Sequence, residues 1–227
     1  MTRIFNIFTS FLDAAFNFIY PPFCIVCESR QQSGAVLVCE VCWEKLPRLE
    51  PQVGDAAISG VSRSLSVWEY GDGMQRIIHE FKFFGKKSLG PFLALEMAGH
   101  AKKDRDFSHA DLIVPVPLHP TKLRERGFNQ SVILSEHVAR ILHIPVQPNV
   151  LIRKRYTKPQ STLNSIQREK NMRNAFDVQN VQLIKYKSII LVDDVMTTGS
   201  TVKACAECLL GGGAHCILTL TAAKTVK

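Results

Sequence analysis

The sequence predicts an α/β fold with a mostly parallel sheet, preceded by a small cysteine-bearing module. Two observations support the α/β class. Short apolar runs alternate with helical patterns over most of the chain, and "SIILVDD" has the continuous apolar character of a strand covered on both faces. A third observation supports the module, because four of the seven cysteines form two CxxC pairs near the start of the chain.

Composition and charge narrow the possible classes. The chain has 227 residues, of which 46% are hydrophobic and 21% are charged. This length allows one sizeable core plus a small accessory unit, and the composition excludes a disordered chain. The formal net charge of +8 predicts an anionic partner, which could be nucleic acid, a phosphorylated small molecule or a membrane surface. Composition alone does not choose among the three.

Residues 1–22 are predicted to form an amphipathic helix that ends at two consecutive prolines. Its apolar residues recur at roughly helical spacing: Ile4, Phe5, Phe8, Phe11, Ala15 and Phe18. Asp13 interrupts the apolar run and no small-residue cleavage site follows, which argues against a membrane span and a signal peptide. We expect the helix to pack on the protein's own core, with peripheral membrane contact or partner docking as alternatives. The protein is expected to be cytoplasmic.

Residues 23–50 are predicted to form a zinc-binding module. Cys24 and Cys27 form one CxxC pair, and Cys39 and Cys42 form the second after eleven intervening residues. Each pair can hold one side of a tetrahedral zinc ion, and four thiolates leave no open coordination position, so this zinc would be structural. Four unliganded thiols and a redox pair are the alternatives.

Residues 60–227 are predicted to form the α/β domain, after a linker that contains proline and glycine. "SVWEYGDG" is typical of a strand and a turn, and residues 74–103 of a helix, a basic turn and a second helix. "DLIVPVP" is predicted to be a short buried strand whose two prolines mark its exit. "FNQSVILSEHVARILH" is predicted to be helical.

The carboxyl-terminal part continues the alternation of helices and strands. Residues 153–173 are polar and basic with little apolar periodicity, which predicts a long loop. "STVKACAECLLGGG" is typical of a helix closed by glycines, and "AHCILTLTAA" of a final strand. Cys205 and Cys208 in this helix, and Cys216 in this strand, are expected to be core residues.

The stretch "IILVDDVMTTGST" carries the clearest sign of a ligand site. A buried strand places Asp193 and Asp194 at its carboxyl end, where open α/β sheets bind ligands. A turn follows in which Gly199 allows close backbone approach and several hydroxyls can donate, and it leads into a helix amino terminus that favours anions. This pattern predicts a phosphate cradle. The adjacent carboxylates could accept hydrogen bonds from ribose hydroxyls or hold Mg²⁺ beside a pyrophosphate.

This stretch resembles the phosphoribosyl-pyrophosphate (PRPP) motif of type I phosphoribosyltransferases, in which an apolar strand, paired acids and a Thr-Thr-Gly turn follow one another. The resemblance implies a fold of that class, with Asp193 and Asp194 holding the ribose at the catalytic centre and Mg²⁺ accompanying PRPP. It also implies that the turn holds the 5′-phosphate through Val195, Thr197, Thr198, Gly199, Ser200 and Thr201.

The order of motifs along the chain is similar to the ComF family, which is named for competence. These motifs are the two CxxC pairs, "IHEFKFFGKKSLG", "DLIVPVPLHPTKLRERGFNQS", "LIRKRYTKPQSTLNSIQREKNMRNAF" and "LVDDVMTTGST". That family joins a zinc-binding module to a phosphoribosyltransferase domain. The resemblance implies a role in natural transformation through the uptake or reuse of external DNA.

The same resemblance assigns roles to basic residues. The loop after "DLIVPVP" would contact pyrophosphate through Lys122, Arg124 and Arg126. Residues 153–173 would form a mobile hood that excludes water from PRPP. The candidates in the hood are Arg153, Arg155, Gln160, Arg168 and Asn171.

Several other residues receive weaker predictions. Asn129 and Gln130 are expected to cap or stabilise the helix that they begin. Phe81, Lys82 and Lys86 could face a phosphoribosyl acceptor. His79 and His119 could act as general bases, but a lone histidine is more often structural, and the structural role is preferred for both.

Two functions from different classes follow. The first is a phosphoribosyltransferase, in which an acceptor not readable from the sequence attacks the anomeric carbon of PRPP. The second is a non-enzymatic competence factor that binds single-stranded DNA, a helicase or another DNA-processing protein, with a PRPP site that is a sensor or vestigial. Transformation without both aspartates would exclude the PRPP-dependent hypothesis.

Overall fold

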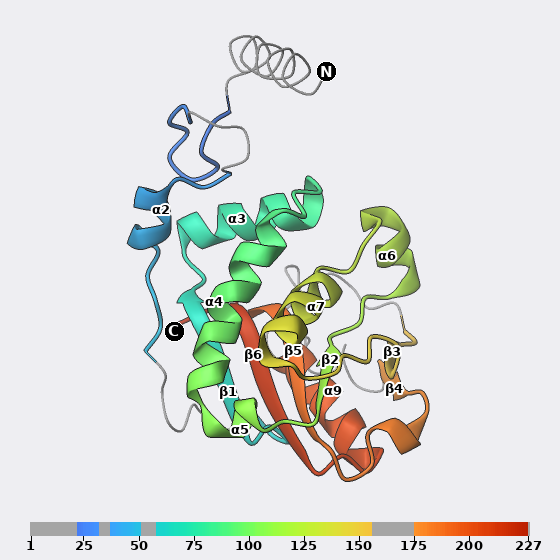
Figure 1. Cartoon of the computed structure of the whole chain (residues 1–227). Helices are drawn as coiled ribbons and strands as arrows, with labels where there is room; N and C mark the ends of the chain where they lie inside the picture. Colours follow the sequence, from blue (N-terminus) through green and yellow to red (C-terminus); the bar gives the residue numbers. More distant parts are fainter. Residues whose placement is uncertain (1–21, 32–36, 51–57, 156–174, 227) are drawn as a thin grey trace, which may run out of the picture.

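The computed structural model describes residues 22–31, 37–50, 58–155 and 175–226. Its main sheet has the strand order β1-β6-β5-β2, and each neighbouring pair is parallel (Figure 1). These strands are β1 (Arg63–Glu69), β2 (Leu112–Pro115), β5 (Ser188–Met196) and β6 (Cys216–Lys224). The predicted mostly parallel sheet is confirmed. All four carboxyl ends lie at one edge, where open α/β sheets place ligands.

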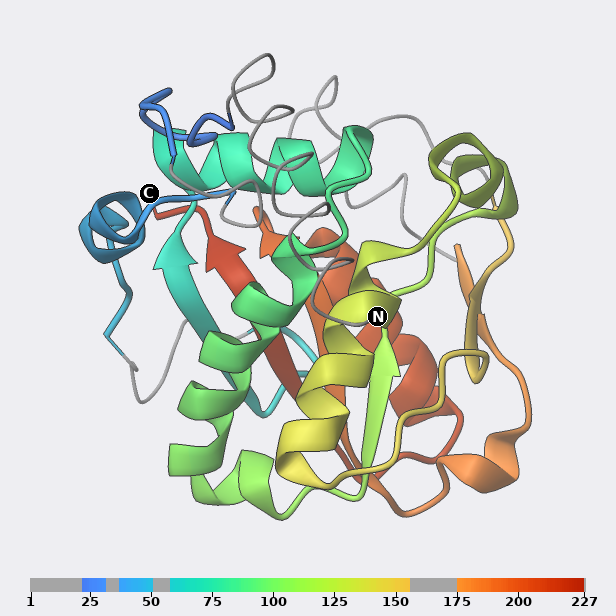
Figure 2. The same ribbon diagram turned by 45° about the horizontal axis from the view of Figure 1, so that its top comes forward.

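Helices cover both faces of this sheet, as an α/β fold requires. α4 (Leu89–Lys103) and α7 (Gln130–Leu142) pack against each other and on one face, while α9 (Ser200–Gly211) lies on the other (Figure 2). α3 (Asp72–Phe83) and α5 (Arg105–Ser108) both contact α4. The helices predicted from the sequence over α3, α4, α7 and α9 are therefore present.

Strand β5 shows why its sequence is apolar without alternation. Ile190 and Val192 belong to the hydrophobic cluster that lies between the sheet and α3, α4 and α7. Ile189 and Leu191 belong to the second cluster, which contains the buried side chains of α9. Successive strand residues point to opposite faces, so a strand covered on both sides needs apolar residues at every position.

The segment between β2 and α7 differs from its prediction. It contains a helix, α6 (Pro120–Arg126), where a basic loop was expected. Pro120 stands at a helix start, where its missing N–H costs nothing, and the side chain of His119 accepts a hydrogen bond from the Thr121 N–H at 3.2 Å. Gly127 ends the helix with a φ of 77°. Helix capping therefore outweighs the polar composition here.

The segment predicted as a long loop, residues 153–173, is flanked by two short strands that pair with each other in antiparallel fashion. β3 (Leu151–Arg153) pairs with β4 (Phe176–Val178), and Arg153 stands opposite Phe176 in the register. A short 3₁₀ helix, η2 (Val181–Leu183), follows. The pairing holds residues 153 and 176 together at the base of the intervening segment.

The cysteine module shares the core of the larger domain. α2 (Glu40–Lys45) lies in this module, and its buried Cys42 belongs to the same hydrophobic cluster as Trp68 of β1 and Met74 of α3. The rings of Trp43 and Trp68 are 5.7 Å apart between their centroids. Because these contacts cross from the module to β1 and α3, the two parts form one packed body.

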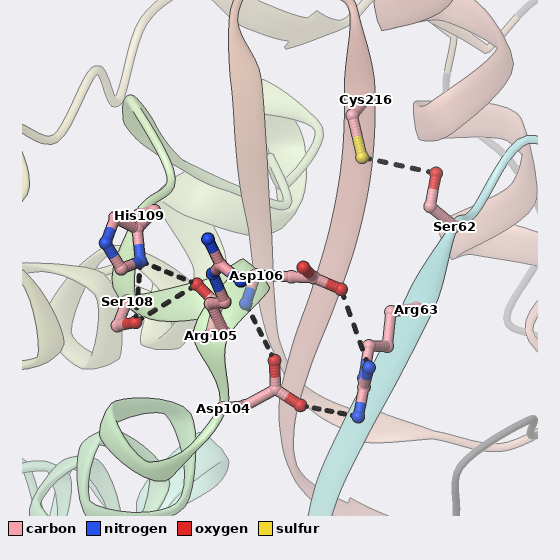
Figure 3. A network of polar contacts seen from close by, with 8 residues as sticks. All are labelled: Ser62, Arg63, Asp104, Arg105, Asp106, Ser108, His109 and Cys216. Carbon is pink, nitrogen blue, oxygen red and sulfur yellow. Dashed lines mark hydrogen bonds and ion pairs between the residues drawn. The ribbon is translucent and has the colours of Figure 1, made fainter.

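A polar network lies at the amino-terminal edge of the sheet, away from the carboxyl ends (Figure 3). Arg63, the first residue of β1, pairs with Asp104 at 2.8 Å and with Asp106 at 3.5 Å, between guanidinium nitrogen and carboxylate oxygen. Cys216, the first residue of β6, donates to the Ser62 hydroxyl at 3.2 Å. These contacts fasten the α4–α5 corner to the edge strand.

Some predictions lie outside the described residues. They are the amphipathic helix up to residue 21 and the hood residues Gln160, Arg168 and Asn171. Within the described part of the chain, no helix has the length and apolar character needed to cross a membrane.

Candidate active site and metal centre

Asp193 and Asp194 lie at the carboxyl end of β5 and are 9% and 2% exposed. Asp193 Oδ1 accepts hydrogen bonds from the Ser131 hydroxyl at 2.9 Å and from the Asp194 N–H at 2.9 Å. Asp194 Oδ1 accepts one from the Val195 N–H at 2.7 Å. Ser131 stands in the first turn of α7, so the helix that packs on β5 also supplies a donor to its carboxylate.

The second carboxylate has a charged partner from another element. Asp194 Oδ2 forms an ion pair with Lys82 Nζ at 2.8 Å. Lys82 is in the last turn of α3, which lies across the carboxyl edge of the sheet (Figure 2). The two adjacent carboxylates disfavour each other's ionised forms, and Lys82 pairs with Asp194.

Burial and the neighbouring Asp194 raise the pKa of Asp193 from its ordinary value of 3.8 to about 7. Lys82 and the hydrogen bonds from Ser131 and from the Asp194 backbone act in the opposite direction. Burial outweighs them, so the ionised form of Asp193 is costly in the ligand-free protein. A ligand that brings hydroxyl donors or a cation to this carboxylate would favour ionisation.

The turn after β5 has the geometry that the sequence predicts for it. Gly199 has a φ of 73° and is the residue before the first turn of α9. A Cβ at this position would stand 2.9 Å from Ile58 Cδ1, so both the conformation and the space favour glycine. The hydroxyls of Thr198 and Ser200 are 2.8 Å apart. Of the predicted turn residues, Thr197 and Thr201 line the cavity at the carboxylate edge, whereas Thr198, Gly199 and Ser200 do not.

A cavity of about 880 Å³ opens at this edge. Predicted site residues from four separate segments line it: Asp193, Asp194, Val195, Thr197, Thr201, Lys122, Arg126 and Arg153. His79, Lys82 and His119 line it as well. The fold thus brings together carboxylates, hydroxyls and cations that lie up to 173 residues apart, from Glu28 to Thr201.

The cations of the cavity are held by neighbouring groups. Arg126 donates to Gln130 Oε1, and its guanidinium carbon is 5.1 Å from the Phe83 ring centroid. The guanidinium carbon of Arg153 is 5.6 Å from the ring of Phe176, its register partner. Burial lowers the pKa of both arginines, although the carboxylates nearby oppose this. A guanidinium keeps its proton under ordinary conditions in proteins, so both side chains can still serve as cations.

Other predicted residues lie elsewhere. Arg124 and Arg155 are exposed and are not among the residues that line the cavity. The expectation for Phe81 is wrong, because its ring is fully buried in the core, 6.0 Å from Phe128 between ring centroids. The expectation for Asn129 is confirmed: its side chain accepts from the Ser131 N–H at 3.0 Å and caps α7.

Sequence reasoning missed part of the cavity wall. Ser131 was not singled out, although it is the hydroxyl donor to Asp193, and its position one residue inside a predicted helix start gave the only signal. Glu28, Tyr70 and Arg76 also line the cavity. They could not be found from the sequence, because their place depends on how the module packs against α3.

Four cysteines of the module converge as predicted. The Sγ atoms of Cys24, Cys27, Cys39 and Cys42 all lie within 4.8 Å of one another. The Cys27 and Cys39 sulfurs are 3.8 Å apart, which is the spacing of about 3.8 Å that tetrahedral Zn–S bonds of about 2.3 Å produce. The four thiols fit one structural zinc ion.

The thiols differ in electrostatic surroundings. Hydrogen bonds from Ser29 lower the pKa of Cys27 to about 6, while burial raises that of Cys42 well above its ordinary value. The remaining cysteines behave as core residues. Cys205 is fully buried, and Cys208 packs against the same cluster.

Comparisons with known families agree with this architecture. The family model of the phosphoribosyl transferase domain matches residues 129–225, and that of the double zinc ribbon domain matches residues 15–54. The second match contains four cysteines, enough for a single four-thiolate site. The fold and the site define a protein with a phosphoribosyltransferase-type domain joined to an amino-terminal zinc ribbon.

Proteins of similar sequence identify the family to which the chain belongs. The DNA utilization protein YhgH of Escherichia coli is 33% identical over 168 residues, covering 72% of this chain and 73% of the relative. Competence protein F of Haemophilus influenzae is 29% identical over 198 residues, covering 83% and 78%. Competence protein ComFC of Bacillus subtilis is 32% identical over 149 residues, covering 65% and 58%. The chain belongs to the ComF family of these proteins.

Proposed function

We propose that this protein binds PRPP with Mg²⁺ in the cavity at the carboxyl edge of the sheet and transfers its phosphoribosyl group to an acceptor. The observation that carries the proposal is the buried Asp193–Asp194 pair, which shares one cavity with Thr197 and Thr201 of the following turn and helix and with the cations Lys122, Arg126 and Arg153. The turn provides donors for a 5′-phosphate, the carboxylates provide acceptors for ribose hydroxyls, and the cations match a pyrophosphate.

In this proposal each group has a stated role. Thr197 and Thr201 hold the 5′-phosphate, together with the amino terminus of α9 behind Gly199. Asp193 and Asp194 accept hydrogen bonds from the ribose hydroxyls, which supply the donors that the ligand-free carboxylates lack. Lys82 pairs with Asp194 Oδ2 and holds that carboxylate in place.

The pyrophosphate would lie against the basic side of the cavity, near Lys122, Arg126 and Arg153. Mg²⁺ takes its ligands from one or two carboxylates and from substrate phosphates, so Asp193 and Asp194 are the residues that would hold it, and it would neutralise pyrophosphate charge.

The proposed reaction exchanges one bond at the anomeric carbon. The bond to pyrophosphate breaks, its electron pair leaves with the pyrophosphate oxygen, and the acceptor nucleophile forms the new bond. Charge stabilisation by Arg126 and Arg153, with positioning by the carboxylates, would supply most of the rate enhancement. His79 and His119 both line the cavity and are candidates to take the acceptor's proton.

The biological setting follows from the relatives, whose names refer to competence and DNA utilization. We propose a cytoplasmic role in natural transformation, through the uptake or reuse of external DNA. The proposed division of the chain is an amphipathic helix over 1–22, a zinc module over 23–50 and a phosphoribosyltransferase-like domain over 60–227.

One surface favours a second candidate, a factor that binds single-stranded DNA or a helicase. Phe83 and Phe84 are both 62% exposed, and their ring centroids lie 4.9 and 5.5 Å from that of His79. Lys86 and Lys87 follow them in the chain and are exposed. Exposed aromatic rings beside cations are what single-stranded nucleic acid uses for stacking and phosphate contact.

Calorimetric titration with PRPP, with and without Mg²⁺, tests the first proposal. Asp193→Asn and Asp194→Asn should each weaken PRPP binding by about tenfold or more, because each removes a charged acceptor for a ribose hydroxyl. Asp106→Asn, at the opposite edge of the sheet, is the matched control and should bind as the parent does. A folded, zinc-loaded protein that does not bind PRPP would exclude the proposal. Where binding occurs, pyrophosphate release with candidate acceptors then tests turnover.

A further inference from the structure

The cysteine module reaches the same cavity as the catalytic edge. Ile25 and Glu28, which stand between and just after the first two cysteines, line the cavity together with Asp193 and Asp194. The packing of the module against α3 thus places it within reach of a ligand in this cavity.

Ile25 and Glu28 form a wall of the cavity, and contacts between the cysteine module and α3 fix the position of this wall. Arg76 Nη1 is 3.0 Å from Glu28 Oε1 and donates to the Val26 carbonyl at 3.3 Å. Gly73 lies under the module so closely that a Cβ there would stand 2.9 Å from Leu46 Cδ2 and 3.4 Å from Val26 Cγ1. The ion pair is exposed and contributes little stability by itself, so the close packing at Gly73 is the firmer anchor.

The turn around Cys24 and Cys27 also sets the backbone conformation of Glu28. Its φ of 61° is in the left-handed region, and its N–H donates to the Cys24 carbonyl at 2.9 Å. Glutamate rarely adopts this conformation, and here the turn between the two cysteines imposes it. Loading of the four thiolates would therefore determine where this carboxylate stands.

Helix α3 links Glu28 to the proposed ribose carboxylates. Arg76, which pairs with Glu28, and Lys82, which pairs with Asp194, are six residues apart on this helix, a rise of about 9 Å along its axis. The interval between these two ion pairs is the part of the cavity where an acceptor would approach a ribose held at Asp194.

The side chains of this interval differ from those around the proposed phosphate sites. They are carboxylates, an amide, a phenol and exposed aromatic rings: Glu28, Glu80, Gln75, Tyr70, His79 and Phe83. Carboxylate and amide oxygens accept hydrogen bonds from N–H groups, and the ring of Phe83 offers a face for stacking. Arg76 lines this interval as well, but it is paired with Glu28, so the interval carries less positive charge than the side with Lys122, Arg126 and Arg153.

We propose that the zinc module forms the outer wall of the acceptor half of the cavity, with Glu28 as a specificity-determining residue. The acceptor it selects is a neutral heterocycle of the nucleobase class that carries N–H donors. This inference rests on the proposed function, because the acceptor half is defined by a ribose held at Asp193 and Asp194.

The test separates the two halves of the cavity with two probes. Ribose 5-phosphate reaches only the proposed PRPP half, whereas adenosine 5′-monophosphate and guanosine 5′-monophosphate add a base with N–H donors. Calorimetry of the full-length, zinc-loaded protein should show that at least one of the nucleotides binds about tenfold more tightly than ribose 5-phosphate. The base would then provide the difference.

Glu28→Gln keeps the size of the side chain and removes its charge. It should reduce the nucleotide advantage to about twofold and leave ribose 5-phosphate binding unchanged. Glu44→Gln is the matched control, since Glu44 is an exposed glutamate of the same module that does not line the cavity. Zinc content and thermal unfolding, measured on both variants, should equal those of the parent.

The outcomes distinguish this inference from the proposed function. If ribose 5-phosphate does not bind, the PRPP proposal fails, and this inference fails with it. If ribose 5-phosphate binds but neither nucleotide binds more tightly, only the acceptor assignment is overturned. If the advantage survives Glu28→Gln unchanged, the module is not part of the acceptor wall.

Discussion

Asp193 is a deeply buried carboxylate, and burial disfavours its ionised form. Its neighbours supply two hydrogen bonds to one oxygen, and the nearby lysine is paired with Asp194. Folding raises its pKa above the ordinary value of 3.8, to about 7. The native state consequently holds this proton more tightly than the unfolded chain does.

This shift predicts a pH dependence of stability. Because the native state binds the extra proton between pH 4 and 7, the free energy of unfolding should fall as the pH rises through that range and level off above about pH 7. The free energy of unfolding of Asp193→Asn should not fall in this way with pH. Above pH 7 it should exceed that of the parent by roughly 1 to 3 kcal/mol. Urea unfolding from pH 4 to 8 checks it.

The hydrogen bonds from Ser131 and from the Asp194 N–H can both reach the amide oxygen of the variant, so fold integrity should survive. A gap between the two proteins that stayed constant with pH would contradict the assignment of the shift to Asp193. Asp193→Asn should be more stable and also bind PRPP more weakly, because the carboxylate whose ionisation destabilises the fold is the proposed acceptor for a ribose hydroxyl.

Among the elements, α3 connects the two parts of the molecule. Its amino-terminal half packs under the cysteine module at Gly73, and its last turn carries Lys82 to Asp194. The sequence predicted this helix and the module separately. Their mutual packing could not be read from either pattern, because it depends on a glycine contact and on apolar residues that look like ordinary core positions.

Removal of zinc should therefore affect more than the module. Without metal the four cysteines lose the ion that joins them and the module is expected to unfold, which would expose the cluster around Trp68 and Met74. We expect a chelator to lower the melting temperature by about 5 °C or more, and added zinc to restore it. Differential scanning fluorimetry with metal analysis measures both.

Metal stoichiometry separates the module from the remaining cysteines. The parent should contain one zinc per chain, Cys27→Ser should contain less, and Cys208→Ser should match the parent. An unchanged zinc content in the Cys27 variant would contradict the four-thiolate assignment.

The strands and long helices were the predictable elements, because their apolar patterns report burial directly. The sequence of β5 and its following turn predicted where the carboxylates lie and that a tight turn with glycine follows them, although not that Gly199 has a positive φ. α6 and the β3–β4 pair were not predicted. Their segments are polar, and they depend on a cap at His119 and on pairing across residues 154–175.

At the scale of the whole molecule, the cations behind the formal charge of +8 can bind an anion at two places. They can hold PRPP in the cavity or contact DNA on the outer surface. The exposed rings of Phe83 and Phe84 next to Lys86 and Lys87 would serve the second. A DNA-binding surface and a PRPP site make different predictions, because surface cations act on a polyanion through salt-sensitive contacts.

We expect oligo-dT to bind in a salt-dependent manner, and Lys86→Glu with Lys87→Glu to weaken this binding by about tenfold at low salt. Lys102→Glu with Lys103→Glu, two adjacent exposed lysines at the end of α4, is the matched control. Fluorescence anisotropy at several salt concentrations measures the effect. Equal losses in both double variants would indicate general attraction to the net charge instead of a defined surface.

The chain contains two tryptophans, and they stand on opposite sides of the junction between the module and the larger domain. Trp43 belongs to α2 and Trp68 to β1, with ring centroids 5.7 Å apart. Indole emission is sensitive to solvent and to close neighbours, so the unlabelled protein carries its own optical reporter of this junction. Its spectrum can follow in real time whether the module is seated while metal, nucleotide or DNA is added.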